Sequence, residues 1–321
     1  MSVLIYIEHE DGVVKKSSLE AVSYGKTLAE SLGTEAVAVG LGSISSEEWA
    51  LVGHAGASKG YHVNDSRLNA GIIQAHTAAV SEVFEHTGAD VLVLAKSSLG
   101  DAVAARLSVK LQAALVSNVV SLPDLADGFQ VKRSIFTGKA FAITAVQTSK
   151  KILAIKKNIL EIRQDAIDIP VEEFAVSLED RVFAAKITGT EKAEGEISLP
   201  EADIVVSGGR GLKGPENWGI IEDLAKALGA ATGCSKPVSD LNWRPHHEHV
   251  GQTGIKVSPS LYVAVGISGA IQHLAGVNAS KNILVINKDP EAPFFKAADY
   301  GIVGDAFEVL PKLTEAIKAI K

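Results

Sequence analysis

The chain has 321 residues, of which 46% are hydrophobic and 21% charged, with a formal net charge of −7 and a single cysteine, Cys234. This length suits about two ordinary domains, and the apolar content is too high for a disordered protein. The negative charge, without a long run of Lys or Arg, argues against nucleic acid as a partner. One cysteine excludes an intrachain disulfide and any metal or iron–sulfur site that needs several cysteines.

The chain contains no stretch that reaches the roughly 18 to 20 continuous apolar residues of a membrane-spanning helix, so we expect a protein that is not membrane-embedded. Its first residues, MSVLIYIEHEDG, form a short apolar run followed by acids. They lack the basic start and the small-residue cleavage site of a secretory signal. We therefore expect a cytoplasmic protein if the chain is bacterial, or one of the mitochondrial matrix if it is a processed eukaryotic chain.

In the first third of the chain, apolar runs of strand length alternate with amphipathic stretches of helix length. We expect strands at 3–7, 36–42 and 90–95, and helices at 17–32, 47–56, 69–88 and 100–115. Gly88 suits the left-handed residue that often ends a helix. This alternation predicts a mostly parallel sheet with right-handed crossovers.

The pattern changes near residue 129. FQVKRSIFTGKAFAITAVQ (129–147) and KILAIKKN (151–158) alternate β-branched residues with no helix between them, so we expect antiparallel strands or hairpins there. Segment 172–202 is charged and loosely patterned, and we interpret it as the passage out of the first domain. We therefore predict an N-terminal domain of residues 1–190, used for scaffolding and subunit contact, and a C-terminal domain of residues 191–321.

The C-terminal domain returns to a regular alternation of strands and helices. We expect strands at 202–209, 261–268, 282–289 and 300–305, and helices at 216–230, 269–276 and 306–321. The fold class is therefore α/β, with two three-layer domains whose sheets are mostly parallel. We expect Trp49, Trp218 and Trp243 to be packing residues.

Four strand-end turns of the C-terminal domain are polar or rich in glycine. They cover residues 207–214, 266–273, 287–289 and 304–305. Open parallel sheets bind ligands at the carboxyl ends of their strands, where free N–H groups favour phosphate. The first turn matches neither the dinucleotide fingerprint nor the P-loop. Its Arg210 is either a phosphate ligand or a surface residue paired with a nearby Glu. In the first domain, the turn KSSLGD (96–101) is a weaker candidate for a ligand site.

The segment GISGAIQHLAG (266–276) contains a helix start. Ser268 occupies the expected N-cap position, and Gly269 and Ala270 leave the start of the helix open for a pyrophosphate. Gln272 and His273 then fall in the first turn with uncharged hydrogen-bonding groups. A histidine at such a position is more often structural than a ligand contact.

The segment HHEHVGQTG (246–254) permits two interpretations. Its three histidines and one glutamate suggest a metal cluster, but neighbouring residues point apart and the HExxH spacing is absent. Gln252 and Thr253, beside two glycines, instead suit close approach to a planar ligand.

These motifs together resemble the FAD domain of electron transfer flavoprotein alpha subunits. The resemblance extends from about Ile204 to Lys318 and is carried by VSGGRGLKGPENW, VGQTG, LYVAVGISGAIQHLAG and INKDPEAPFFKAADYGIVGD. The first domain resembles the family less sharply, in ADVLVLAKSSLGDAVAARLSVKLQAALVSNV and RSIFTGKA. The resemblance implies that the C-terminal domain is a Rossmann-like FAD-binding domain.

The resemblance also implies which residues contact FAD. For the phosphates and the ribityl chain they are Arg210, Ser268, Gly269, Ala270 and Ile271. For the adenosine end they are Asn287, Asp305 and Ala306. For the isoalloxazine ring they are Ser235, Lys236, Gln252, Thr253 and His273, with Thr253 near N5, His273 near the O2 edge, and backbone contacts from Val250 and Gly251. Gly266 and Gln272 are expected to contact the cofactor as well. The resemblance implies neither a catalytic acid–base residue nor a metal ligand.

One position departs from the family pattern. Where the family usually has Ser-Arg, this chain has Ser235 followed by Lys236. The family arginine lies against the flavin ring, and lysine keeps the charge but loses the planar group that stacks on a ring. We expect FAD to bind still, with altered reduction potentials.

The function implied by the resemblance is that of an electron carrier without an organic substrate of its own. It implies a heterodimer with a beta subunit that holds AMP, a flavin-containing dehydrogenase as electron donor, and a quinone oxidoreductase or similar acceptor. Three alternatives stay open: an electron-bifurcating complex with a second FAD in the beta subunit, a flavin-dependent dehydrogenase, and a plain nucleotide-binding module.

Overall fold

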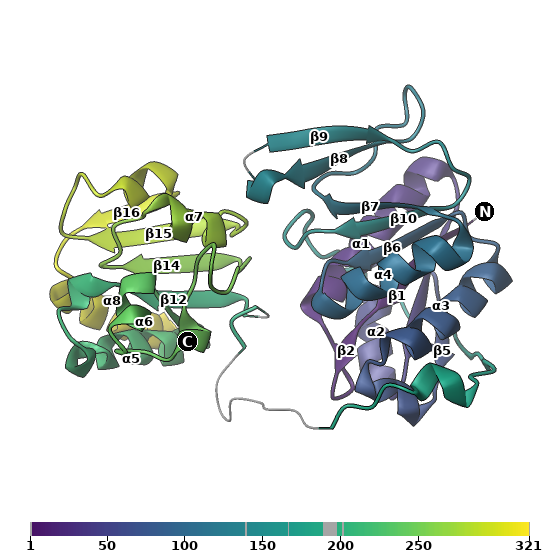
Figure 1. Cartoon of the computed structure of the whole chain (residues 1–321), viewed down its shortest axis with the longest axis horizontal. Coiled ribbons are helices and arrows are strands. Elements are labelled where there is room, and N and C mark those ends of the chain that lie inside the picture. The colour runs from purple at the N-terminus through teal and green to yellow at the C-terminus, as the bar shows by residue number, and fades with distance from the viewer. Residues whose placement is uncertain (1, 139, 166, 189–197, 201, 321) are drawn as a thin grey trace. The chain divides into compact units, whose positions relative to one another are not determined.

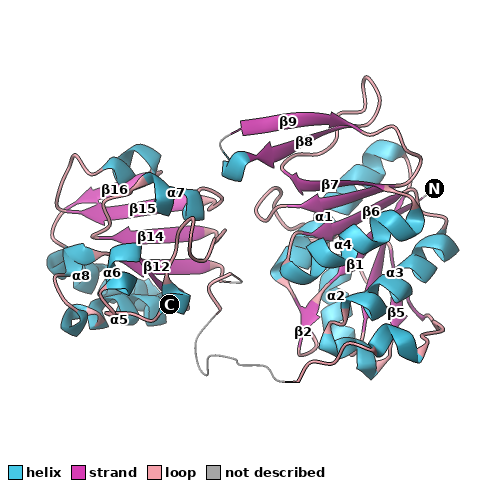
Figure 2. Cartoon of the chain, in the orientation of Figure 1, coloured by secondary structure: helices cyan, strands magenta, loops and turns pink. Residues whose placement is uncertain are grey.

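The computed structural model describes residues 2–138, 140–165, 167–188, 198–200 and 202–320. The chain divides into two compact units, Met1–Thr190 and Glu191–Lys321, each an α/β unit with its own sheet and core (Figures 1 and 2). Among the described helices, none is long and apolar enough to cross a membrane.

The N-terminal unit contains a nine-stranded sheet. In sheet order its strands are β11 (Val171–Glu173), β5 (Lys59–Val63), β4 (Glu35–Leu41), β1 (Ser2–Ile7), β6 (Val91–Ala95), β10 (Lys151–Ile155), β7 (Ala114–Val119), β8 (Gln130–Ile135) and β9 (Ala140–Ala145). Neighbours are parallel from β11 to β7 and antiparallel from β7 to β9. A short antiparallel ladder joins β2 (His9–Glu10) and β3 (Val13–Val14).

Helices cover both faces of this sheet. They are α1 (Lys16–Leu32), α2 (Ser46–His54), α3 (Ile73–Thr87) and α4 (Ser98–Leu111), with 3-10 turns η1 (Ser66–Ala70), η2 (Phe136–Gly138) and η3 (Asp180–Phe183). One core contains Ile5 with Trp49 of α2, and the core on the other face contains Leu4 with Phe84 of α3. Gly88 ends α3 in the left-handed conformation, as its sequence position predicts.

The expectation of antiparallel strands after residue 129 is confirmed for β8 and β9 and wrong for β10. β10 lies between β6 and β7 and is parallel to both. Its side chains are buried on both faces, with Ile152 in one core and Leu153 in the other. An apolar run of this kind is typical of a central parallel strand.

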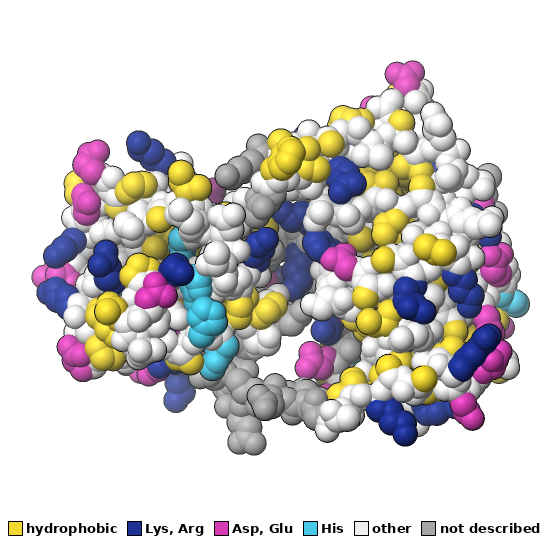
Figure 3. Space-filling model, viewed as in Figure 1, with side chains coloured by type: hydrophobic (Ala, Val, Ile, Leu, Met, Phe, Trp, Pro, Cys, Tyr) yellow, Lys and Arg dark blue, Asp and Glu magenta, His cyan; other side chains and the backbone are white. Residues whose placement is uncertain are grey.

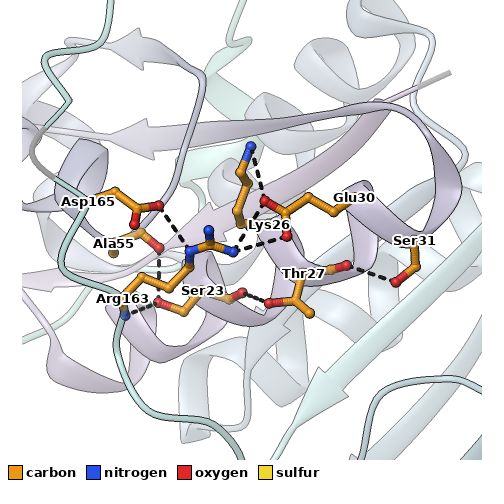
Figure 4. A network of polar contacts seen from close by, with 8 residues as sticks. All are labelled: Ser23, Lys26, Thr27, Glu30, Ser31, Ala55, Arg163 and Asp165. Carbon is orange, nitrogen blue, oxygen red and sulfur yellow. Dashed lines mark hydrogen bonds and ion pairs between the residues drawn. The ribbon is translucent and has the colours of Figure 1, made fainter.

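A polar network then fixes the segment after β10 against α1 (Figure 4). The guanidinium of Arg163 donates to Asp165 at 2.9 Å and to Glu30 of α1 at 3.0 Å. The Arg163 N–H donates to Ser23 Oγ at 3.0 Å, and the Ser23 hydroxyl donates to the carbonyl of Ala55 at 2.9 Å. These contacts hold the irregular segment after β10 against helix α1.

The C-terminal unit contains a five-stranded, wholly parallel sheet. In sheet order its strands are β13 (Ala231–Cys234), β12 (Ile204–Gly208), β14 (Leu261–Val265), β15 (Asn282–Asn287) and β16 (Tyr300–Val303). The remaining elements are α5 (Gly219–Leu228), α6 (Lys236–Asp240), α7 (Ile271–Val277), α8 (Ala306–Ile320), η4 (Arg210–Leu212), η5 (Pro215–Asn217), η6 (His246–Glu248) and η7 (Pro293–Ala297).

This sheet also has a core on each face. α5 and α8 contribute Leu224 and Leu310 to one core, whereas Phe294 of η7 packs with Tyr262 of β14 in the other. The layered α/β prediction is confirmed for both units. β13 was not expected, because ATGC is short and its glycine breaks the apolar pattern. Trp49 and Trp218 are buried, and Trp243 packs against the α5–α8 core, as expected of packing residues.

Candidate functional site

The sheet of the C-terminal unit has a topological switch point between β12 and β14. The chain leaves β12 towards β13 on one side and returns to β14 on the other. The strand-end turns meet there through their backbones: Gly209 N–H donates to the Val265 carbonyl at 2.8 Å, and Gly211 N–H to the Gly266 carbonyl at 3.1 Å. This is the place where an open α/β sheet offers its ligand crevice.

Glycine is required for this approach. A methyl group on Gly209 would lie 2.2 Å from the Gly266 carbonyl oxygen, and one on Gly211 would lie 2.7 Å from the Gly266 Cα. Gly266 itself has φ of +61°, which L side chains rarely adopt. The turns after β12 and β14 therefore present backbone groups instead of side chains at the switch point.

Arg210 begins η4 directly after this contact and is exposed. Within the described residues it forms no ion pair, so the alternative of a surface Arg–Glu pair is not observed there. Its guanidinium is a planar fork suited to bind phosphate oxygens.

The prediction that Ser268 is an N-cap is wrong. α7 begins after Ala270, and the Ser268 carbonyl instead accepts from the N–H of Phe294 at 3.1 Å. The cause is Gly269, whose φ of +86° makes a further turn, and a methyl group there would lie 2.5 Å from the Phe294 backbone. Ala270 is exposed, and the side chain of Ile271 is 67% exposed. The start of α7 is therefore open to solvent.

The VGQTG loop lies between β13 and the start of α7. Val250 N–H donates to the Cys234 carbonyl at the end of β13, at 2.9 Å, and Gln252 N–H donates to the Gln272 carbonyl of α7 at 2.8 Å. The side chains of Gln252 and Thr253 are exposed. Gly251 is buried, and a methyl group on it would lie 3.3 Å from the Gln272 carbonyl oxygen. The loop and the start of α7 are thus joined by a backbone hydrogen bond.

His273 is buried beneath this surface. Its Nε2 lies 2.8 Å from the hydroxyl of Tyr262. Its Nδ1 has no hydrogen bond of normal geometry to any described residue. Burial, and next the nearby His249, lower the pKa of His273 to about 4, against a smaller opposite effect of the Val250 backbone. At neutral pH the ring is therefore uncharged.

Ser235 and Lys236 follow β13 at the same edge. Ser235 is buried, and its N–H donates to the Gly208 carbonyl at the end of β12, at 3.0 Å. Lys236 is the first residue of α6, with an exposed side chain whose Nζ lies 4.0 Å from Asp240. The ammonium group is thus held near the edge by a loose pair in the same helix.

The turns after β15 and β16 are joined by Asn287. Its Nδ2 donates to the Ile267 carbonyl at 3.0 Å, and its own carbonyl accepts from Gly304 at 3.1 Å. Asp305 Oδ1 accepts from the N–H of Phe307 at 3.0 Å, which caps α8, and Ala306 is buried at the start of that helix. Asn287 therefore binds the β14 turn to the β15–β16 edge, whereas Asp305 has a structural role in addition to any ligand contact.

The histidine-rich segment is organised around an ion pair. Glu248 is buried and accepts from Arg244, at 2.5 Å from Nη2, and Arg244 also donates to Glu222 of α5 at 3.0 Å. The part of the chain that the structure describes contains no group of three or more His, Cys, Asp or Glu placed to hold a metal. Figure 3 shows histidine side chains in one band on this unit.

Two relevant residues escaped the sequence analysis. Tyr262 lies inside an apolar strand, and nothing in LYVAV marks its hydroxyl as the partner of His273. His249 was considered only as a metal ligand, yet it is buried at the start of the VGQTG loop. Its position directly before that loop was the available signal.

The residues expected to contact FAD therefore lie on adjoining turns at the carboxyl edge of one sheet. The edge combines close-packed glycine backbones, an exposed arginine, an exposed isoleucine and a buried histidine nitrogen without a regular partner. These groups fit an extended ligand with phosphates and a flat ring. They define the unit as a dinucleotide-binding domain.

Comparison with known proteins gives the class of this domain. Residues 198–278 match the sequence model of the electron transfer flavoprotein FAD-binding domain, and residues 3–179 match that of the electron transfer flavoprotein domain. The cofactor of the C-terminal unit is accordingly FAD.

Individual relatives agree over the whole chain. It is 36% identical over 323 residues to the electron transfer flavoprotein subunit alpha of Bacillus subtilis, covering 99% of this chain and 98% of that protein. The subunit of the same name from Mycobacterium tuberculosis is 37% identical over 323 residues, covering 99% of each chain. Protein FixB of Escherichia coli is 37% identical over 266 residues, covering 82% of this chain and 84% of that protein. The chain belongs to the electron transfer flavoprotein alpha subunit family.

Proposed function

We propose that this chain is the FAD-carrying subunit of a heterodimeric electron carrier that passes single electrons from a dehydrogenase to a respiratory-chain acceptor. The observation that supports it most is the convergence of the β12 and β14 turns with the VGQTG loop and His273 at one edge. The described residues of that edge include no paired carboxylates, and the thiol of Cys234 beside His249 is buried with a pKa raised to about 12, which does not suit an activated nucleophile. An electron carrier needs neither.

The chain's own residues divide the binding of FAD between them. Arg210 would hold the phosphates beside the joined glycine turns, whose own glycine N–H groups are bonded within the protein, and the segment from Ser268 to Ile271 would hold the ribityl chain. Asn287 and the start of α8 at Asp305 and Ala306 would hold the adenosine end. Because the glycine turns are fixed to each other by backbone hydrogen bonds, this part of the site is formed before the ligand binds.

The ring end is assigned to Ser235, Lys236, Gln252, Thr253 and His273. FAD, when bound there, supplies the group that gains and loses electrons. Lys236 places a positive charge at the edge, and His273 presents a neutral ring that can accept a proton when negative charge develops beside it. The buried side of the loop, formed by Val250 and Gly251, excludes water from one side of the site.

The partners follow from the family. The relatives named above are alpha subunits, which supports a beta subunit as partner of this chain. We propose that the beta subunit completes the flavin site and holds AMP. We further propose a flavin-containing dehydrogenase as donor and a quinone oxidoreductase, or a similar protein, as acceptor.

The test is the absorption spectrum of the copurified alpha–beta complex, followed by stepwise reduction. We expect a yellow complex with one FAD per heterodimer that accepts electrons from a dehydrogenase and has no turnover with small organic substrates alone. A colourless complex that does not take up added FAD would contradict the proposal. Two FAD per heterodimer would instead indicate the bifurcating class, and direct oxidation of an organic substrate would indicate a dehydrogenase.

A further inference from the structure

Two buried histidines lie on either side of Gly251 in the loop assigned to the flavin ring. His249, directly before the loop, is 3% exposed, and His273 of α7 is 6% exposed. A methyl group on Gly251 would lie 3.3 Å from His249 Nε2 and 3.8 Å from His273 Cα. Gly251 therefore lies next to both the ring of His249 and the backbone of His273.

Each ring has an Nδ1 that is buried and makes no hydrogen bond of normal geometry to a described residue, although the Val250 backbone lies close enough to His273 to favour a proton on it. His273 uses its Nε2 for the hydroxyl of Tyr262. Burial raises the pKa of that hydroxyl well above its ordinary value, so Tyr262 stays protonated and neutral. Unpartnered buried ring nitrogens are unusual in proteins and point to a functional use.

The charged and titratable groups around His249 come from three elements. α6 contributes Lys236, which opposes a proton on His249, and Asp240, which favours one. The segment before the loop contributes His246, whose ring centroid is 5.6 Å from that of His249. β13 contributes Cys234, whose backbone pairs with that of His249 in an isolated bridge and whose thiol has a pKa raised to about 12 mainly by burial.

Two further groups near this segment carry charges that are already paired. The carboxylate of Glu248 is bound by Arg244, which also contacts Glu222 of α5.

Burial is the largest effect on both His249 and His273, and it lowers the pKa of each. A positive charge on His249 further disfavours a proton on His273.

We propose that His249 is a positioning residue for the flavin site, which acts by controlling when His273 becomes protonated: the two rings hold at most one proton between them. This inference rests on the proposed function, because it needs His273 beside the flavin. An electron delivered to the site adds one negative charge, and one proton from solvent on His273 balances it. The proton leaves a hydronium ion or water molecule of the solvent, whose O–H bond breaks, and forms an N–H bond at Nδ1 of His273, while His249 stays neutral so that His273 can accept it.

The experiment is an NMR pH titration of the alpha–beta complex with the histidine Cε1 carbons labelled. In His249→Gln, which removes the competing cation and keeps a polar side chain, the midpoint of the His273 titration is expected to move to higher pH. His247→Gln removes an exposed histidine of the same segment and is expected to leave it unchanged. A His273 midpoint that is equal in wild type and His249→Gln would overturn the proposal.

A second variant keeps the test decisive if His249→Gln does not fold. His246→Gln removes the ring that lies 5.6 Å from His249, so the His249 midpoint is expected to rise. With His249 then more easily protonated, the His273 midpoint is expected to fall. An unchanged His273 midpoint in this variant would contradict the coupling.

The effect of His249 on the flavin is tested by measuring the reduction potential of bound FAD as a function of pH. The inflection of this curve is expected to move to higher pH in His249→Gln, in the same direction as the His273 midpoint. An inflection that does not move while the NMR midpoint does would refute the role at the flavin. Failure of the complex to bind FAD would refute the proposed function alone, since the NMR titration does not require the flavin.

Discussion

The two units are built on the same principle and use their switch points differently. In the N-terminal unit the switch point lies between β1 and β6, and the chain's own carboxylate is placed there. Glu8, directly after β1, is buried and accepts from the Ser97 hydroxyl at 2.6 Å, and Ser97 Oγ accepts from Gly100 N–H at the start of α4. In the C-terminal unit the corresponding place holds the backbones of Gly209, Gly211 and Gly266.

The comparison shows how one architecture becomes either a scaffold or a binding domain. A helix N-terminus favours negative charge, whether it comes from a side chain or from a ligand's phosphate. Glu8 supplies that charge internally, which gives the KSSLGD turn a structural role. The C-terminal turns contain closely packed glycines and an exposed Arg210 instead, and no buried carboxylate takes the place that Glu8 has in the N-terminal unit among the residues described there.

The largest effect is expected from a substitution that disrupts the close approach of the two glycine turns at the C-terminal edge. Gly209→Ala places a methyl group 2.2 Å from the Gly266 carbonyl oxygen, so the two turns must separate. We expect FAD to be lost from the purified complex and the free energy of unfolding to fall by about 1–3 kcal/mol, as for other overpacked sites. Flavin absorbance per protein and denaturant unfolding measure both.

The matched control is Gly219→Ala in α5, where a methyl group would meet no atom within 4 Å. It should retain FAD and stability. Equal FAD content in Gly209→Ala and Gly219→Ala would show that the close approach of the two turns does not matter for binding.

Lowering the pH should reduce the free energy of unfolding, because His273 is buried in its neutral form. The pKa of His273 is about 4 in the folded chain and 6.5 ordinarily, so the folded state binds fewer protons between these values. Its stabilising contribution is therefore present above pH 6.5 and is lost as the pH falls towards 4, by about 2 kcal/mol between pH 7 and pH 5. Unfolding at several pH values should show a flatter profile for His273→Gln than for His247→Gln. Parallel profiles would contradict a buried neutral His273.

Opening the N-terminal edge should convert part of the scaffold into an anion site. Glu8→Ala leaves the Ser97 hydroxyl without its acceptor and is expected to cost about 1–3 kcal/mol locally. Hydrogen exchange at residues 98–101 should accelerate, and inorganic phosphate should slow it again. The exposed Glu10 supplies the control Glu10→Ala. If phosphate does not slow hydrogen exchange in Glu8→Ala, the Glu8 carboxylate does not occupy a place that a phosphate could take.

The smallest effect is expected from the residue that departs from the family pattern. Lys236→Arg restores a planar cation at the C-terminal edge, and a stronger attraction to the ring, on the order of 1 kcal/mol, should raise the reduction potentials of FAD. Spectroelectrochemistry measures these potentials. Lys226→Arg on α5 is the control for the effect of a Lys-to-Arg substitution elsewhere in the unit. Matching potentials in wild type and Lys236→Arg would exclude Lys236 from tuning.

Much of this fold was predictable because its signals are local. Alternating apolar runs and amphipathic stretches locate the strands and helices of both units, and glycine-rich strand ends locate the binding edge. β10 was misassigned because its parallel neighbours come from distant segments, and local alternation does not reveal which strands will flank it. β13 was missed because four residues with a glycine carry little pattern.

The side-chain roles at the two edges were harder to predict. Ser268 has the residue type of an N-cap, but Gly269 inserts a turn before the helix begins. Glu8, an acid after an apolar strand, is typical of a surface residue, and only the approach of α4 shows that it is buried. The Tyr262–His273 hydrogen bond likewise depends on the packing of α7 against β14.

The central claim, that the carboxyl edge of the C-terminal sheet binds FAD and the corresponding edge of the N-terminal sheet does not, is tested most directly by hydrogen exchange. The alpha–beta complex should be compared with and without FAD. We predict slower exchange at residues 207–214, 249–255 and 266–273, and no change at residues 96–101. Unchanged exchange in the C-terminal turns, or protection at residues 96–101, would contradict the account.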